Sequence, residues 1–139
     1  MNYKIIGKYI KDLRFEIPNP KTFFLLEKNI SNYKINIDIK SKQFKDKIIE
    51  VETTLALTPN SDDFDKINTK IIFATIIEIN GELTNKQALE EVILIKVPNE
   101  TYPEIRALFV LLFEKSGFKK IKIEEKINFK KLYSKRTIQ

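Results

Sequence analysis

The chain has 139 residues, of which 32% are charged, and Lys plus Arg outnumber Asp plus Glu by 25 to 19. It contains no Cys and no His, which removes disulfides, thiolate chemistry, the commonest metal ligand and the usual acid–base side chain. Its three Gly residues stand too far apart for a phosphate-binding loop, so we expect neither an enzyme nor a bound cofactor. The length and the lack of a secretory signal predict one cytoplasmic domain over residues 1–139, with no segment that inserts into a membrane.

Apolar and polar residues alternate, as in β-strands, over much of the first half of the chain. The pattern holds over four segments: residues 9–17, 33–40, 48–57 and about 66–79. In the first segment, Asp12, Arg14 and Glu16 are expected to face water. Turn-forming residues follow the third segment at 58–63 and the fourth at 80–81. Four such strands with one polar face predict an antiparallel sheet.

Helical signals dominate the second half of the chain. Residues 84–92 fit a short helix, although the β-branched residues that follow also fit a strand. Thr101 and Glu104 have the spacing of a capping box, in which the two side chains bond the free amides at the start of a helix. Gly117 supplies an end signal. We therefore predict a long helix over 102–115, with Thr101 as its N-cap.

The predicted long helix is apolar on nearly every side, so it has to be buried on more than one of them. A single sheet covers one side only, which leaves the other for a second subunit or, alternatively, for the chain's own C-terminal segment. We expect a subunit interface that includes Leu108, Val110, Leu111 and Phe113. A last short helix, over about 128–135, is predicted to begin at Asn128.

Several short motifs stand in a fixed order over about residues 9–133. They are residues 9–13, 15–20, 24–27, 50–51, 98–99, 102–103 with Arg106, 117–118, 127–129 and 132–133. In this order and at this spacing they resemble the SecB family of bacterial protein-export chaperones. The opening YIKDL and FEIPNP motifs and the closing INFKKLY are the most specific of them.

The resemblance implies an α+β fold, in which a four-stranded antiparallel β-sheet has a long helix and a short C-terminal helix packed on one side. It also implies a homotetramer, assembled as a dimer of dimers. The implied activity is that of a holdase, which binds unfolded precursor proteins without ATP and passes them to the export motor SecA. Such a protein needs an apolar groove for extended segments and requires no catalytic group.

Aromatic residues of the motifs supply the client-binding groove that the resemblance implies. Phe23 and Phe118 are added because they are aromatic neighbours of the motif residues. The predicted groove therefore consists of Phe23, Phe24, Leu26, Tyr102, Phe118, Phe129 and Tyr133. Pro18 and Pro20 end the first strand, because they fix the backbone and lack donors, and so direct Phe23 and Phe24 across the groove. Ordinary packing in the core is the alternative role for each of these side chains.

An acidic patch on the polar face of the sheet is the SecA-docking surface that the resemblance implies. Asp12, Glu16 and Glu50 match it here, but the formal net charge of +6 departs from the acidic balance of the family. This departure leaves open a solitary chaperone dedicated to one client, such as an antitoxin. It also leaves open a basic module that binds nucleic acid, although Lys greatly outnumbers the Arg that phosphate recognition favours. We expect protein clients rather than nucleic acid.

Overall fold

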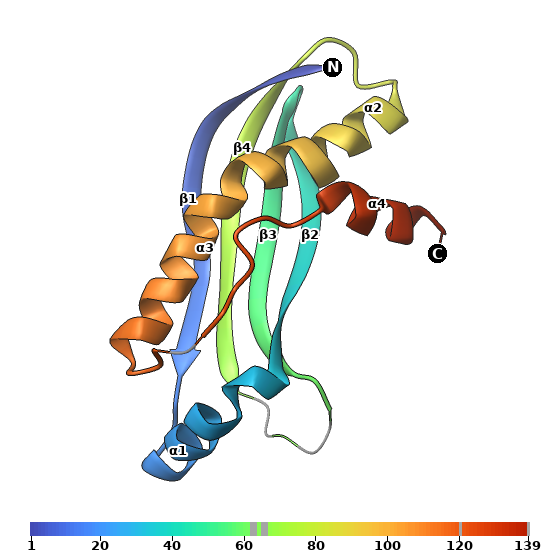
Figure 1. Ribbon diagram of the computed structural model, residues 1–139. Coiled ribbons are helices and arrows are strands. Elements are labelled where there is room, and N and C mark those ends of the chain that lie inside the picture. The colour runs from blue at the N-terminus through green and yellow to red at the C-terminus, as the bar shows by residue number, and fades with distance from the viewer. Residues whose placement is uncertain (62–63, 65–66, 120, 139) are drawn as a thin grey trace.

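Four long strands form one antiparallel sheet in the order β1-β4-β3-β2 (Figure 1). In this computed structural model the strands are β1 (Asn2–Glu16), β2 (Tyr33–Lys45), β3 (Ile48–Pro59) and β4 (Asn68–Asn80). The structure describes residues 1–61, 64, 67–119 and 121–138. Residues 62, 63 and 66, which belong to a predicted turn and to the predicted start of the fourth strand, lie outside this description. The antiparallel sheet predicted from the alternation is confirmed.

Two bulges interrupt the pairing of β1 with β4, one between Ile5 and Gly7 and one between Ile10 and Asp12. Each adds a residue without a partner on β4 and so shifts the alternation of faces. The predicted uninterrupted alternation over 9–17 is therefore wrong at Lys11. Beyond the second bulge Asp12, Arg14 and Glu16 do lie on one face, opposite Ile72, Lys70 and Asn68 of β4.

The helices of the second half of the chain lie against one face of the sheet (Figure 1). They are α2 (Lys86–Glu91), the π-helical η2 (Val92–Lys96), α3 (Val97–Lys115) and α4 (Phe129–Ile138). The helix α1 (Pro20–Asn29) and the short η1 (Ile30–Asn32) that follows it stand at one end of the sheet. The other face, called the open face below, carries no helix within the described part of the chain. A sheet with a long helix and a short C-terminal helix on one side confirms the predicted α+β architecture.

The long helix begins earlier than the capping box predicted. Asn85 is the N-cap, since its side chain accepts a hydrogen bond from the amide of Ala88 at 3.1 Å. The backbone then remains helical through α2, η2 and α3. Thr101 lies inside α3, where its hydroxyl donates to the carbonyl of Val97, four residues earlier, at 3.0 Å. Its hydroxyl bonds within the helix rather than at the start of it, so the predicted N-cap is wrong.

Helix α1 has no counterpart among the predicted elements. The side chain of Asn19 accepts a hydrogen bond from the amide of Thr22 at 2.8 Å, and Pro20 occupies the first helical position. An Asn N-cap followed by Pro is a strong start signal, because Pro lacks only an amide that has no partner there. The rigid corner at the end of β1 is therefore also the start of a helix.

The core lies between the sheet and α3. Val51, Leu55, Ile71 and Ile77 of the sheet have no exposed surface, nor do Ile105, Phe109 and Phe113 of α3. Phe113 packs edge-on against Phe15 of β1, with ring centres 4.8 Å apart. Burial of such large side chains holds α3 firmly on the strands, each contributing about 1.5–3 kcal/mol.

Candidate client-binding surface

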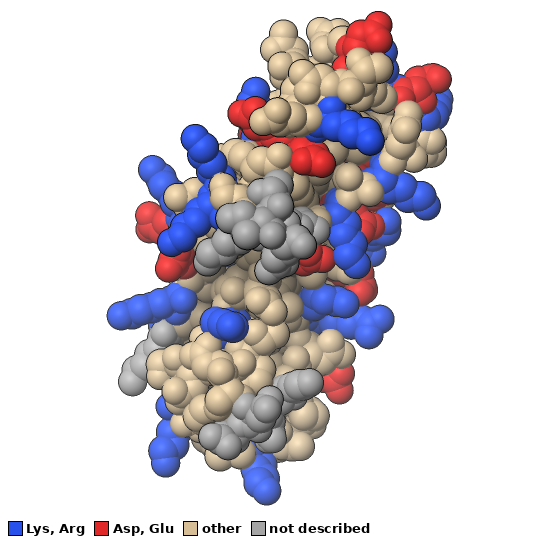
Figure 2. All heavy atoms as spheres, turned by 90° about the vertical axis from the view of Figure 1, so that its right-hand side faces the viewer, with Lys and Arg blue, Asp and Glu red and all other residues tan. Residues whose placement is uncertain are grey.

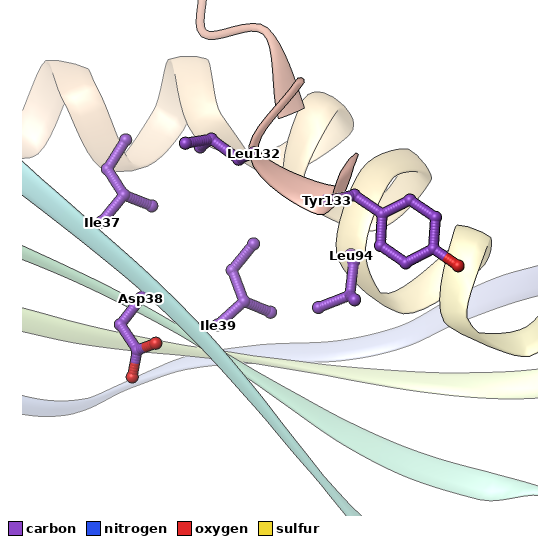
Figure 3. A pocket seen from close by; sticks show the side chains of 6 residues that line it. All are labelled: Ile37, Asp38, Ile39, Leu94, Leu132 and Tyr133. Atoms are coloured by element: carbon purple, nitrogen blue, oxygen red, sulfur yellow. The ribbon is translucent and has the colours of Figure 1, made fainter. Parts of the chain in front are cut away.

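A groove runs beside β2, where this edge strand meets η2 and α4. It consists of two adjoining cavities of about 200 and 610 Å³. Six side chains surround the smaller cavity: Ile37, Asp38, Ile39, Leu94, Leu132 and Tyr133 (Figure 3). The larger cavity shares Ile39, Leu94 and Tyr133 and extends toward Lys40 and Glu90. The two together, called the β2 groove below, have an apolar lining with charged residues at their ends.

The alternation of β2 supplies one wall of the β2 groove. Ile37 and Ile39 pair with Leu55 and Thr53 of β3, both fully buried, so they lie on the helix-covered face of the sheet. Because β2 is the last strand of the sheet, no further strand covers the space beside it. The π-helical η2 supplies Leu94 from the opposite side. A π-helical turn is rare and is often found at functional sites.

Helix α4 forms the third wall and is anchored by its first residue. Asn128 accepts a hydrogen bond from the amide of Lys131 at 3.0 Å, which confirms the predicted cap. Phe129 is buried, and its ring lies 5.9 Å from that of Tyr102 in an edge-on arrangement. The next turn of α4 carries Leu132 and Tyr133 at the groove.

Hydrogen bonds from two helices fix the C-terminal segment in place. The hydroxyl of Tyr133 donates to Glu90 of α2 at 3.0 Å, and this bond is the main reason that the pKa of Tyr133 is raised. The hydroxyl of Tyr102 donates to the carbonyl of Glu124 at 2.6 Å, and Arg106 donates to the carbonyl of Ile123 at 3.0 Å. Burial raises the pKa of Tyr102. The segment that leads to α4 is thus held across α3. The sequence predicted this cover of the long helix as the alternative to a second subunit.

The predicted groove residues divide into surface and core. Tyr133 lines the β2 groove, and Phe24 is 64% exposed on α1. Phe23 is half-buried against Phe118, with ring centres 4.9 Å apart. The remaining four are almost completely buried within their own chain: Leu26, Tyr102, Phe118 and Phe129. In this conformation those four side chains stabilise the fold and present no surface to a client.

The sequence prediction missed most of the β2 groove. Ile37, Ile39, Leu94 and Leu132 line it without having been singled out. The alternation in β2 showed which of its residues would share a face, but only the strand order shows that β2 is an edge. That order depends on pairings between distant segments, which periodicity does not reveal.

The predicted docking carboxylates lie on the open face, where cations of the same chain approach them. Arg14 pairs with Asp12 at 3.3 Å. Glu50 accepts hydrogen bonds from the hydroxyl of Tyr9 and, at 3.5 Å, from the ammonium of Lys11. Glu16 is exposed. Two of the three predicted carboxylates therefore have a neighbouring cation that weakens their field.

The cation of Lys11 is shared between two carboxylates of β3. It also pairs with Glu52, and this hydrogen bond is the main reason that the pKa of Lys11 is raised. The hydrogen bond to Glu50 raises the pKa of Tyr9 in the same way. The side chains of Tyr9 and Lys11 reach from β1 to β3 across Ala74 of β4. Ala74 is fully buried beneath them.

Apolar side chains also remain exposed along the edge of β1. Ile10 and Leu13 pair with the core residues Phe73 and Ile71 but are 46% and 39% exposed. Ile6 and Leu111 are equally exposed nearby on β1 and α3. These four residues are called the β1 strip. Leu108 and Val110 are half-buried, whereas Phe113 is fully buried in its own core, so Phe113 is withdrawn from the predicted interface.

Two kinds of feature are missing from the described residues. None of their helices is both long enough and apolar enough to cross a membrane. Their Asp and Glu side chains form no group of three or more that could hold a metal ion.

Comparison with known proteins places this chain in a family. The family model described as preprotein translocase subunit SecB matches residues 1–139. The putative protein-export protein SecB of Pelagibacter ubique is 40% identical over 97% of this chain and 96% of its own length. The protein-export protein SecB of Herminiimonas arsenicoxydans is 29% identical over 96% of this chain and 79% of its own length.

A solved structure has the same fold. It is a SecB-like chaperone of Mycobacterium tuberculosis in complex with a peptide from the HigA1 antitoxin. The TM-score is 0.54 at 12% identity, and the match covers 88% of each chain. The match of the family model over the whole chain, together with the 40% identity to the Pelagibacter relative, shows that this chain belongs to the SecB family.

Proposed function

We propose that this chain, a chaperone of preprotein export by its family, works as an ATP-independent holdase. In this proposal it binds unfolded precursors in the β2 groove and transfers them to SecA in the cytoplasm. The family consists of chaperones rather than enzymes, and we propose that this chain has no enzymatic activity and needs no cofactor.

The β2 groove is the observation that carries the proposal. Its walls present aliphatic side chains and one aromatic ring beside the last strand of a sheet. An extended segment can place every second side chain in such a groove, whatever the sequence between them. A surface of this kind suits many unfolded clients and rejects folded ones, whose apolar side chains are already buried.

We further propose that Phe24 and its exposed neighbour Leu25 form a second contact for clients on α1. Helix α1 stands at the opposite end of the sheet from the β4–α2 connection (Figure 1). A long unfolded segment reaches both sites, and binding at two sites on one chain raises the overall affinity.

Substitution in the β2 groove tests the proposal. We expect Leu94→Ser combined with Leu132→Ser to weaken suppression of aggregation of a denatured precursor, measured by light scattering. Burial of a Leu side chain contributes about 1.5–3 kcal/mol when it is complete. If a client buries each of the two Leu side chains only half, their loss lowers the affinity for the client about tenfold or more.

Phe44→Ala is the matched control, because Phe44 is an exposed apolar residue outside the groove. Circular dichroism shows whether the double variant keeps its fold. If a folded double variant protects the precursor as well as the control does, clients bind elsewhere and the proposed groove is wrong.

SecA docking is proposed for the open face around Asp12, Glu16 and Glu50. The pairing of Asp12 with Arg14 and of Glu50 with Lys11 means that a docking segment competes with cations of the chain itself. We therefore propose a weak, salt-sensitive contact. The likeness to the antitoxin-bound chaperone extends to the fold alone, so export remains the proposed role.

A homotetramer is also part of the proposal. The β1 strip supports this assembly, because its residues Ile10, Leu13 and Leu111 are exposed at the uncovered edge of the sheet. A second copy of the chain that packs there removes this apolar surface from water and covers an edge strand.

A further inference from the structure

The hairpin between β2 and β3 ends in a protruding aromatic side chain. Phe44 is 72% exposed, more than any other exposed large hydrophobic residue of the described chain. It lies at a bulge between Gln43 and Lys45, where the pairing with β3 shifts. Asp46 turns the chain with a φ of 46°, and its carbonyl accepts a hydrogen bond from Gln43 at 2.6 Å. The turn therefore has a defined geometry that directs the ring outward.

Four exposed lysines stand within four residues of Phe44 in the chain. Residues 40–47 contain Lys40, Lys42, Lys45 and Lys47, with Asp46 as their only acidic residue. The ammonium of Lys45 lies 5.8 Å from the centre of the Phe44 ring. The hairpin tip, defined as residues 40–47, thus combines a net charge of three positive units with an exposed aromatic side chain.

Nearby carboxylates offset part of this charge but form no ion pair with the lysines of the tip within the described residues. Glu52 and Glu50 stand opposite Lys40 and Lys42 in the ladder, but both pair with Lys11 of β1. The ion pairs found within the described residues involve Lys8, Lys11 and Arg14, and none involves a lysine of the hairpin tip. Glu78 of β4 lies next to the tip, where it is opposite Lys4 as well as Ile48.

Lys40 and Ser41, at the base of the tip, line the larger cavity of the β2 groove, but the exposed Phe44 lines neither cavity. A protruding ring close to several lysines in the chain suits a broad surface that is anionic outside and apolar just beneath. A bilayer with anionic headgroups has this structure, and each Lys near it contributes about 1 kcal/mol. Single-stranded nucleic acid favours a groove with several stacking rings, and it favours Arg, so it fits the tip less well.

We propose that the hairpin tip binds the surface of anionic lipid membranes, with Phe44 in the headgroup region and the lysines on lipid phosphates. The contact is peripheral, since one ring and a few charges give reversible adsorption rather than insertion. This inference goes beyond chaperone activity, because it places the chaperone at the membrane without a protein receptor. The tip lies at the end of the sheet opposite α1 (Figure 1).

A single tryptophan tests the contact directly, because the chain contains no Trp. The Phe44→Trp variant is mixed with vesicles of phosphatidylcholine and phosphatidylglycerol in equal amounts, and its fluorescence is measured. We expect a blue shift that decreases as salt is added, and none with pure phosphatidylcholine. Phe24→Trp is the matched control, since Phe24 is also exposed but lies on α1. Its fluorescence should not shift.

Charge reversal tests the lysines in the full chain. Lys45→Glu combined with Lys47→Glu should lower binding to the same vesicles, measured by co-sedimentation, by a factor of about thirty or more, because a loss of about 1 kcal/mol for each lysine amounts to about 2 kcal/mol for the pair. Lys21→Glu combined with Lys28→Glu, on α1, is the control and should bind as the wild type does.

Three outcomes would overturn the proposal. The first is equal binding to anionic and neutral vesicles, or none to either. The second is an equal blue shift for the two tryptophan variants. The third is tighter binding of a single-stranded oligonucleotide that depends on Phe44 and the same lysines, which would identify nucleic acid as the ligand.

Discussion

Tyr3 connects the edge strand β1 to the long helix through one side chain. Its hydroxyl donates to Glu100 at 2.7 Å. Burial, together with this hydrogen bond and the charge of Glu100, raises the pKa of Tyr3 from 10.0 to about 12. The folded chain therefore holds this proton more tightly than the unfolded chain does.

Alkaline pH should destabilise the fold through Tyr3. Below pH 10 the proton is bound in both states, and the stabilisation is fully present. Between pH 10 and about 12 only the unfolded state releases the proton, so the free energy of unfolding decreases as pH rises. Urea unfolding across this range should show a shallower decrease for Tyr3→Phe. Identical slopes would show that Tyr3 does not contribute.

Residue type alone did not reveal which aromatic side chains are on the surface. Tyr102 and Phe129 were predicted in the groove together with Tyr133, yet the first two are buried and only the third lines the groove. Buried and exposed aromatics look alike in a sequence. What separates these is the path of the C-terminal segment across α3, which Tyr102 itself fixes by its bond to Glu124.

Helix α1 is attached to the rest of the molecule by the buried side chain of Leu26 and by an aromatic contact of Phe23. Phe23 packs against Phe118, which follows the C-terminal end of α3. Gly117 lies against the ring of Phe23, and a Cβ added to Gly117 would lie 3.3 Å from two atoms of that ring. The φ of Gly117 is +94°, which disfavours any residue with a side chain.

Substitution of this glycine should loosen α1. We expect Gly117→Ala to destabilise the chain by about 1 kcal/mol or more, since it combines an unfavourable backbone conformation with displacement of Phe23. Hydrogen exchange should become faster over α1 than over β3. Gly81→Ala is the control, because its φ of +120° is also positive but no atom lies within 4 Å of the added Cβ. Equal effects of the two substitutions would show that the Phe23 contact is unimportant.

Prediction of elements succeeded where one local pattern decided the outcome. Alternation located the strands, and Asn128 correctly marked the cap of α4. The prediction of elements failed where two local signals competed for the start of one helix. Thr101 fits a capping box, but the helix already starts at Asn85 and continues through the π-helical η2. Asn85 and Thr101 are both residue types that cap helices, so only the backbone upstream distinguishes them.

At the scale of the whole molecule, the β1 strip and the β2 groove lie on opposite edges of the sheet. Figure 2, which views the molecule from the side of α4, shows Lys and Arg side chains projecting from both flanks. One edge is thus available for assembly while the other remains free for clients. In the proposed assembly, contacts through the β1 strip leave the β2 groove of each subunit open.

Assembly should depend on the β1 strip. We expect the wild type to sediment as a tetramer, and Ile10→Asp combined with Leu111→Asp to shift it to smaller species, because two buried charges are costly at an interface. Phe44→Asp provides a control, since Phe44 is exposed at a distant hairpin. A wild type that sediments as a monomer would contradict the proposed assembly.

The fold could be predicted at this scale, but the positions of the surfaces could not. The order of motifs implied the sheet and helices that the structure shows. The structure shows that the C-terminal segment supplies part of the cover of α3 through Arg106, which is one of the two alternatives between which the apolar pattern of the helix did not decide. Nor could it locate the exposed edge at Ile10, which becomes apparent only from the pairing register.

The β2 groove as the site of client binding is the central claim, and labelling of single cysteines tests it most directly. Since the chain has no Cys, Leu132→Cys and Phe44→Cys each provide one thiol, in the groove and at the hairpin tip. A thiol reagent is added with and without an unfolded precursor, and the two labelling rates are compared. The account predicts that the precursor slows labelling at position 132 and not at position 44. Unchanged labelling at position 132 while the precursor is bound would contradict it.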